Sequence, residues 1–235
     1  MKIAIILALA GLCTVAAAQS GEDNSGTFNV VPFQFDPAGS QLVAAEWRSG
    51  TGCPTSAPIA VYPSTSPTIT YQEPGCPTGD DRDKAVEGLL LAKTGPTANN
   101  ASAGALITGV RGITLTELGY DIRKPDAFVD PRGSHCGAGA PRFNVVTEDN
   151  VTHFVGCASP PPLQTSTGFW IRLRWTAAQA FPPITSSVRS ISIVFDEGQD
   201  TAPDNFGLAV LDNIDINEFS RTRSKRIRRQ VTPRD

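Results

Sequence analysis

Residues 188–217, VRSISIVFDEGQDTAPDNFGLAVLDNIDIN, carry the clearest fold signal in the chain. Apolar and polar residues alternate in 189–195 and alternate again in 206–216. This period of two, rich in β-branched and aromatic residues, predicts two β-strands joined by an acidic loop. We expect this hairpin to close a β-sandwich. The residues expected to face the core in its second strand are Phe206, Leu208, Val210, Ile214 and Ile216.

Asp212 interrupts that apolar face. A carboxylate at a core-facing position costs free energy unless it is paired or binds a cation. The preceding loop is also acidic, with Asp196, Glu197, Asp200 and Asp204, and oxygen-rich turns suit calcium. Asp212 is therefore either a cation ligand or a carboxylate held by hydrogen bonds.

The same alternation recurs along the chain and predicts about nine or ten strands. The clearest is 169–176, FWIRLRWT, where Phe169, Ile171, Leu173 and Trp175 form the core side. The other predicted strands and apolar runs are 28–36 (an edge strand, because of Pro32), 41–48, 67–71, 88–94, 103–110, 113–123, 141–147 and 152–157, the last two forming a hairpin. No sustained helical period occurs. The sequence therefore predicts an all-β fold, a single antiparallel jelly-roll-like β-sandwich.

The ends of the chain differ from its body. Residues 1–18 combine Lys2, an apolar run and small residues at Ala16 and Ala18, which predicts a secretory signal peptide rather than a membrane span. Residues 221–235 hold seven basic residues and one acidic residue, which predicts a disordered basic tail. The domain is then 19–220, secreted and acidic. Secretion and this acidity disfavour a nucleic-acid partner, while the tail can contact an anionic surface polymer.

Four cysteines remain after removal of the leader: Cys53, Cys76, Cys136 and Cys157. An even count in a secreted chain predicts disulfides, and four cysteines allow three pairings. We predict Cys53–Cys76 and Cys136–Cys157, each bridging a loop insertion rich in Gly and Pro. A second interpretation is a metal site formed by His135, Cys136, His153 and Cys157, although their spacing matches no usual zinc pattern.

The last strand also resembles a known family. Residues 210–214, VLDNI, resemble the final strand of galactose-binding-like jelly rolls, the fold of many carbohydrate-binding modules, and 169–175 resembles their arginine-bearing strand. In such families the first Asp helps to hold a structural calcium against residues near the first strand. The resemblance implies that role for Asp212. The N-terminal Glu of the family is missing here, and Asp36 is the substitute that we expect.

The outward side of 169–176 is the predicted ligand patch. An exposed Trp170 can stack on a sugar ring, and Arg172 and Arg174 can donate to its hydroxyls or to a uronate. Arg142 and Asn144 share the outward register of 141–147 and extend the patch if the strands are neighbours. Alternatively, Trp170 packs under a loop and the arginines pair with acids.

Catalytic signatures are absent from the sequence. It contains no Gly-x-Ser-x-Gly elbow, phosphate loop or dinucleotide fingerprint. The acid pairs Asp80-Asp81, Glu148-Asp149 and Asp196-Glu197 could serve a glycosidase only if two carboxylates flank a sugar cleft. We therefore predict a non-catalytic module that binds an extracellular carbohydrate. The alternatives are a structural or surface-interaction protein and a carbohydrate-active hydrolase.

Two N-glycosylation sequons complete the list of motifs. They are Asn100-Ala-Ser and Asn150-Val-Thr, both in loop or turn contexts. Each predicts a modification site if the cell that secretes the chain attaches N-linked glycans.

Overall fold

The computed structural model describes residues 28–53, 86–93, 101–123, 141–156, 163–167, 170–196 and 207–217. These residues form eleven β-strands and one short 3-10 helix. The elements are β1 (Asn29–Phe35), β2 (Val43–Arg48), β3 (Gly88–Lys93), β4 (Ser102–Thr108), β5 (Glu117–Arg123), β6 (Arg142–Thr147), β7 (Thr152–Val155), β8 (Leu163–Thr167), β9 (Trp170–Thr176), η1 (Ala177–Gln179), β10 (Val188–Phe195) and β11 (Gly207–Ile216).

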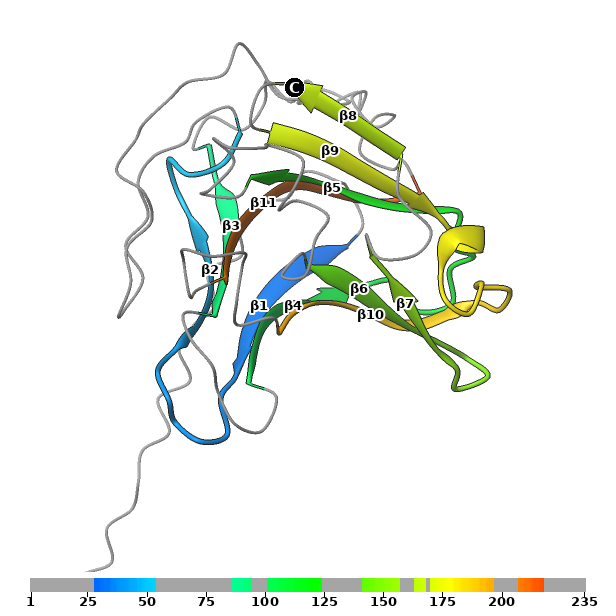
Figure 1. Cartoon of the computed structure of the whole chain (residues 1–235). Helices are drawn as coiled ribbons and strands as arrows, with labels where there is room; N and C mark the ends of the chain where they lie inside the picture. Colours follow the sequence, from blue (N-terminus) through cyan, green and yellow to red (C-terminus); the bar gives the residue numbers. More distant parts are fainter. Residues whose placement is uncertain are drawn as a thin grey trace, which may run out of the picture.

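The strands form two antiparallel sheets, which confirms the all-β prediction. One sheet has five strands in the order β1-β4-β10-β6-β7, and the other has six in the order β2-β3-β11-β5-β9-β8. Figure 1 shows the six-stranded sheet arching over the five-stranded sheet. The chain crosses repeatedly from one sheet to the other, so most sequence neighbours are not sheet neighbours.

One apolar core lies between the sheets. It takes alternate residues from nearly every strand, because successive side chains of a strand point to opposite faces. Its centre is an aromatic cluster in which the Tyr120 ring lies 5.4 Å from both Phe143 and Trp175, centroid to centroid. Phe143 and Trp175 meet edge to face at 6.1 Å. Ile171, Leu173 and Trp175 are in this core, as the alternation of 169–176 predicts.

The predicted hairpin of residues 188–217 is wrong. β10 belongs to the five-stranded sheet, between β4 and β6, whereas β11 belongs to the six-stranded sheet, between β3 and β5. Both are central strands with two hydrogen-bonded neighbours, and their alternation is real. Periodicity identifies the buried face of a strand but not its partner, so two consecutive strands on opposite layers give the same pattern as a hairpin.

The core face predicted for β11 is correct only in its second half. Ala209, Leu211, Ile214 and Ile216 face the core, whereas Leu208 and Val210 belong to a second, smaller cluster on the other side of the sheet. The core-facing positions change from odd to even numbers at a β-bulge. Asp212 pairs with Asp121 and Asp215 pairs with Gly119, so β11 has one more residue than β5 between these two pairs. Asn213 lies in the left-handed region at φ 46° and is the extra residue. Asp212 and Asp215 therefore both lie outside the core.

The strands at the sheet edges match the sequence in part. β1 is an edge strand, as Pro32 predicts, and β6 and β7 form the predicted hairpin. The indole N–H of Trp47 on β2 donates to the carbonyl of Val30 on β1 at 3.2 Å, which joins one edge of each sheet. β8 was not predicted, because LQTST has no clear alternation of apolar and polar residues.

Several predictions fall outside the described residues. They concern the leader 1–18, the tail 221–235, the strand 67–71, and Cys76, Asp80, Asp81, Asn100, His135, Cys136, Cys157, Phe169, Glu197, Asp200, Asp204 and Phe206. Cys53 is the one cysteine in the described ranges, so both disulfide pairings stay predictions. No helix within the described ranges has the length and apolar character needed to cross a membrane.

Substitution of the buried Tyr120 tests the core. Its hydroxyl donates to the carbonyl of Pro141 at 2.6 Å, and burial raises the pKa of the phenol far above its usual value. Tyr120→Phe keeps the ring contacts but removes that donor, so we expect the free energy of unfolding to fall by about 1–3 kcal/mol in urea denaturation. Tyr120→Leu also loses the ring contacts and should cost more. An unchanged free energy of unfolding for Tyr120→Phe would show that the hydrogen bond contributes nothing, and equal costs for the two variants would show that the ring contacts contribute nothing.

Candidate functional site

The predicted ligand patch on β9 is buried. The Trp170 side chain is fully buried on the outer side of the six-stranded sheet, in the cluster with Leu90, Leu208 and Val210. The Arg123 guanidinium lies over its ring, 5.6 Å from the centroid. Trp170 therefore offers no exposed ring face to a sugar, and the expectation of an exposed Trp170 is wrong. The alternation correctly placed this residue on the outer side of the sheet but could not show what covers it.

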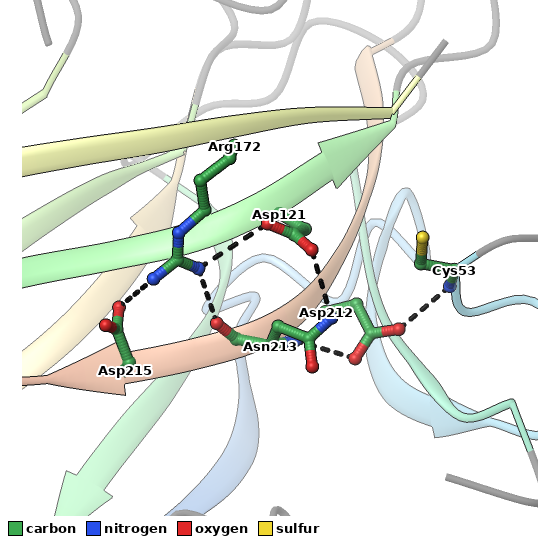
Figure 2. Close-up of polar contacts among 6 residues, drawn as sticks. All are labelled: Cys53, Asp121, Arg172, Asp212, Asn213 and Asp215. Atoms are coloured by element: carbon green, nitrogen blue, oxygen red, sulfur yellow. Dashed lines mark hydrogen bonds and ion pairs between the residues drawn. The ribbon is translucent and has the colours of Figure 1, made fainter. Parts of the chain in front are cut away.

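Arg172, two residues after Trp170 on β9, is buried. Figure 2 shows that it faces acids rather than solvent. Its guanidinium is paired with Asp215, lies 3.5 Å from Asp121 and donates to the carbonyl of Asn213 at 2.7 Å. The Asn213 side-chain amide in turn donates to Asp121 at 3.0 Å. Arg172 thus forms the acid pairing that the sequence left as the alternative. Arg174, the last of the three β9 residues in the predicted patch, is half-buried.

A glycine makes this network possible. Arg172 on β9 reaches Asp215 on β11 across the intervening strand β5, where Gly119 lies between them. A Cβ atom at Gly119 would lie 2.6 Å from the Asp215 carboxylate and 2.8 Å from the Arg172 guanidinium. Any larger residue at this position would force the ion pair apart, because no Cβ atom fits at such distances. The Arg172 side chain therefore connects β9, β5 and β11.

Asp212 and Asp36, the predicted calcium ligands, are both held by hydrogen-bond donors. Asp212 accepts from the backbone N–H of Cys53 at 2.8 Å and of Asn213 at 2.6 Å. Asp36, in the turn after β1, accepts from Ser40 and Gln41, and these bonds lower its pKa. Within the described ranges no three acidic, His or Cys residues cluster as a metal site would need. Both carboxylates are bound by N–H groups, which cannot act as ligands of a cation. Calcium binding stays a prediction from the sequence.

Replacement of Arg172 tests whether the network holds the six-stranded sheet together. Arg172→Met removes the cation that faces two buried carboxylates, so we expect the free energy of unfolding to fall by about 3–5 kcal/mol. Arg172→Lys should recover only part of the loss, because an ammonium cannot reproduce the planar fork of donors. Chemical denaturation monitored by tryptophan fluorescence measures both.

The matched control is Arg111→Met. Arg111 pairs with Glu148 at 3.0 Å, but its side chain is 72% exposed. We expect this substitution to cost less than about 1 kcal/mol. Similar costs for Arg111→Met and Arg172→Met would contradict the importance of the buried network.

Arg142 and Asn144 do not extend the β9 patch. They lie on β6 in the five-stranded sheet, whereas Trp170, Arg172 and Arg174 lie on β9 in the six-stranded sheet. The condition attached to that prediction, that the two strands be neighbours, is therefore not met. Phe143 and Val145 fill the core beside them, so Arg142 and Asn144 point outward as predicted, but on the opposite face of the sandwich.

The outer face of the five-stranded sheet also carries an exposed apolar patch. Phe35 is 48% exposed and Leu106 is 43% exposed, and Phe33 between them is partly exposed. Phe33 lies opposite Gly104 of β4, where a Cβ atom would lie 2.6 Å from the ring of Phe33. The missing side chain lets this ring lie directly on the sheet. We call Phe33, Phe35 and Leu106 the aromatic patch.

A fixed group of polar side chains lies on the same face. The Arg142 guanidinium donates two parallel hydrogen bonds to the Asp196 carboxylate, at 2.6 and 2.5 Å, and a third to Asn144 at 3.2 Å. The Lys93 ammonium donates to the Asp196 carbonyl at 2.5 Å. The hydrogen bonds from Arg142 hold the pKa of the Asp196 carboxyl below its usual value. Arg142, Asn144 and Asp196 remain partly exposed, and we call them the polar group.

Small side chains separate the aromatic patch from the polar group. The strand register places Phe33, Gly104, Val194 and Arg142 in one row across β1, β4, β10 and β6. The next row contains Val31, Leu106, Ser192 and Asn144. Neighbouring strands are about 4.8 Å apart, so the patch and the polar group lie roughly 10–15 Å apart across the sheet. A flat ligand of a few rings can therefore contact both.

The Arg142–Asp196 pair predicts a pH dependence of stability. Because the folded-state pKa of Asp196 is lowered, the pair stabilises the fold above the ordinary carboxyl pKa of about 3.9, and this stabilisation is lost as the pH falls through the lower folded value. We expect the difference in melting temperature between the wild type and Asp196→Asn to be largest above about pH 5 and to shrink below about pH 4. A difference that does not change with pH would refute the assignment.

The remaining candidates have local roles. Glu148 pairs with Arg111, and Asp149 accepts from the hydroxyls of Thr147 and Ser186, which lower its pKa. His153 is buried and bonds to the Thr147 hydroxyl and to the Pro182 carbonyl, so both ring nitrogens are engaged. Of the alternative metal site, His153 is the one residue that the structure describes, and both of its ring nitrogens already bond to protein groups.

Sequence reasoning missed Phe33, Phe35 and Leu106 as surface residues. The sequence of 28–36 contained a signal for two faces, because Phe28 and Val30 are at even-numbered positions and Phe33 and Phe35 at odd-numbered positions. β1 pairs with β4 without a register shift, so even and odd positions lie on opposite faces along its whole length. Phe28 and Val30 therefore face the core, and Phe33 and Phe35 face outward. Leu106 gave no such signal, because one apolar residue on an outer face is common.

No protein-family model and no curated protein matches the chain. Among solved structures, it is similar to the family 11 carbohydrate-binding module of the cellulosomal cellulase Lic26A-Cel5E of Clostridium thermocellum, with a TM-score of 0.39 and 12% identity over 86% of this chain and 95% of that chain. A β-1,2-glucanase from Parabacteroides distasonis gives a TM-score of 0.35 and 14% identity over 74% of this chain and 23% of the glucanase.

The first of these neighbours is of the class that residues 210–214 resemble. The candidate site is defined by the described side chains.

Proposed function

We propose that this chain is a secreted, non-catalytic, jelly-roll-like module that binds an extracellular carbohydrate on the outer face of the five-stranded sheet. The observation that supports it best is the exposed aromatic patch beside a polar group fixed by its own hydrogen bonds. A sugar ring has an apolar C–H face and a rim of hydroxyls, so it needs both kinds of contact.

The polar group suits hydroxyl recognition because it is already ordered. Arg142 is held by Asp196 and Asn144 in the free protein, so binding does not have to immobilise a long flexible side chain. Carboxylate and amide oxygens can accept from sugar hydroxyls, while the guanidinium and amide N–H groups can donate. The charges of Arg142 and Asp196 also offset one another, which favours a neutral glycan over an anionic one.

Aromatic substitution tests the site. In the unglycosylated protein, Phe35→Ala should weaken binding to the best ligand of a glycan panel about tenfold, equivalent to about 1.4 kcal/mol, through the loss of ring stacking. Asn144→Ala should weaken it by a similar factor through a lost hydroxyl contact. Isothermal titration calorimetry measures both, and melting temperatures establish that each variant is folded.

The matched control is Phe181→Ala. Phe181 is 70% exposed, more than Phe35, and it lies at the far edge of the sheet beside β7. Its removal should leave the affinity unchanged. Equal losses for Phe35→Ala and Phe181→Ala, or no binding to any glycan of the panel, would contradict the proposal. The exposed patch would in that case favour the second candidate, a protein-interaction surface.

A further inference from the structure

The hairpin between β6 and β7 presents the sequon Asn150-Val151-Thr152 at its tip. The backbone N–H of Asn150 donates to the carbonyl of Thr147 at 2.9 Å, and the N–H of Thr147 donates to the carbonyl of Val151 at 3.0 Å. Asn150 has φ 63°, in the left-handed region that asparagine tolerates better than most residues. The tight turn thus holds Asn150 out from the sheet, and all three sequon residues are exposed.

The Asn150 side chain is oriented so that its nitrogen is available. The Arg189 guanidinium donates to the amide oxygen of Asn150, which fixes that oxygen against the protein. Within the described part of the chain the amide nitrogen, the atom that a glycan modifies, has no partner. The exposed Thr152 hydroxyl, the other required group of the sequon, likewise has none there.

Two exposed aromatic rings lie close to this turn. Phe154 and Phe181 form an isolated antiparallel bridge with two backbone hydrogen bonds of 2.9 Å, so their side chains lie next to each other. They are 45% and 70% exposed. Thr152 and Phe154 point to the same face by alternation. Phe154 is four residues after Asn150, so the two lie at most about 14 Å apart. An oligosaccharide of several rings can span that distance.

We propose that Asn150 carries an N-linked glycan and that this glycan covers the Phe154–Phe181 pair. The step joins the amide nitrogen of Asn150 to C1 of an oligosaccharide carried on a lipid pyrophosphate. The C1–O bond to the pyrophosphate breaks, its electron pair leaves with the phosphate oxygen, and the nitrogen loses one proton. The cover offsets the cost of leaving two large apolar side chains in water. The site depends on the secretory leader. It lies on the same outer face as the polar group, because Phe154 pairs with Asn144 across β7 and β6.

The modification is tested on the full chain, with its own leader, secreted from a eukaryotic host. Peptide mapping after digestion with peptide-N-glycosidase, which converts a glycosylated Asn to Asp, identifies the modified position. We expect Asn150 to be converted in most molecules of the wild type and of Thr152→Ser, which keeps the sequon. Thr152→Val removes the sequon and should give none. Unmodified Asn150 in the secreted wild type would overturn the proposal.

A second measurement tests the cover. Enzymatic removal of the glycan from the folded protein should raise the fluorescence of an added dye that binds apolar surface. The same treatment of the double variant Phe154→Ser, Phe181→Ser should leave the fluorescence unchanged, because the rings are gone. No rise in the wild type, or an equal rise in the double variant, would show that the glycan does not cover the pair.

Discussion

The ion pairs of Arg172 are the contact on which the six-stranded sheet depends. The guanidinium of β9 reaches across Gly119 of β5 to Asp215 of β11, so one side chain fixes the relative position of three strands. The bulge at Asn213 is part of the same arrangement, because it turns Asp215 to the outer side of the sheet and aligns the Asn213 carbonyl with Arg172. Buried charges add little stability compared with apolar residues, and we infer that the geometry of this ion pair favours a single register of β11.

The sequence predicted the strands better than their partners. The alternation of β9 identified Ile171, Leu173 and Trp175 as core residues, and Pro32 placed β1 at an edge, because both signals are local. The pairing of β10 with β4 and β6, and of β11 with β3 and β5, depends on contacts between distant residues that leave no trace in a single strand. The bulge at Asn213 was also hidden, since Asn and Asp are ordinary in many positions and only the backbone shows the extra residue.

The candidate site could be predicted in part. Outward register identified Arg142 and Asn144, but the sequence could not show that Asp196 would fix Arg142, because the two are 54 positions apart. Trp170 shows the opposite error. The sequence correctly predicted that its side chain points away from the core. A side chain that points outward from a sheet can still be buried, and here Arg123 lies over the ring and the side chain is fully buried. Periodicity reports the direction of a side chain, whereas exposure depends on what the rest of the chain places above it.

The hydrogen bond from Trp47 to Val30 affects how this protein behaves among copies of itself. β1 forms one edge of the five-stranded sheet, and the free side of an edge strand can template the addition of a strand from another molecule. Along that free side the indole of Trp47 already occupies the Val30 carbonyl, and Pro32, two residues on, has no N–H to offer. An incoming strand would lose two successive hydrogen bonds at the centre of its contact. The Trp47 indole and Pro32 thus make this edge a poor template for an added strand, although the partly exposed rings of Phe33 and Phe35 lie beside it.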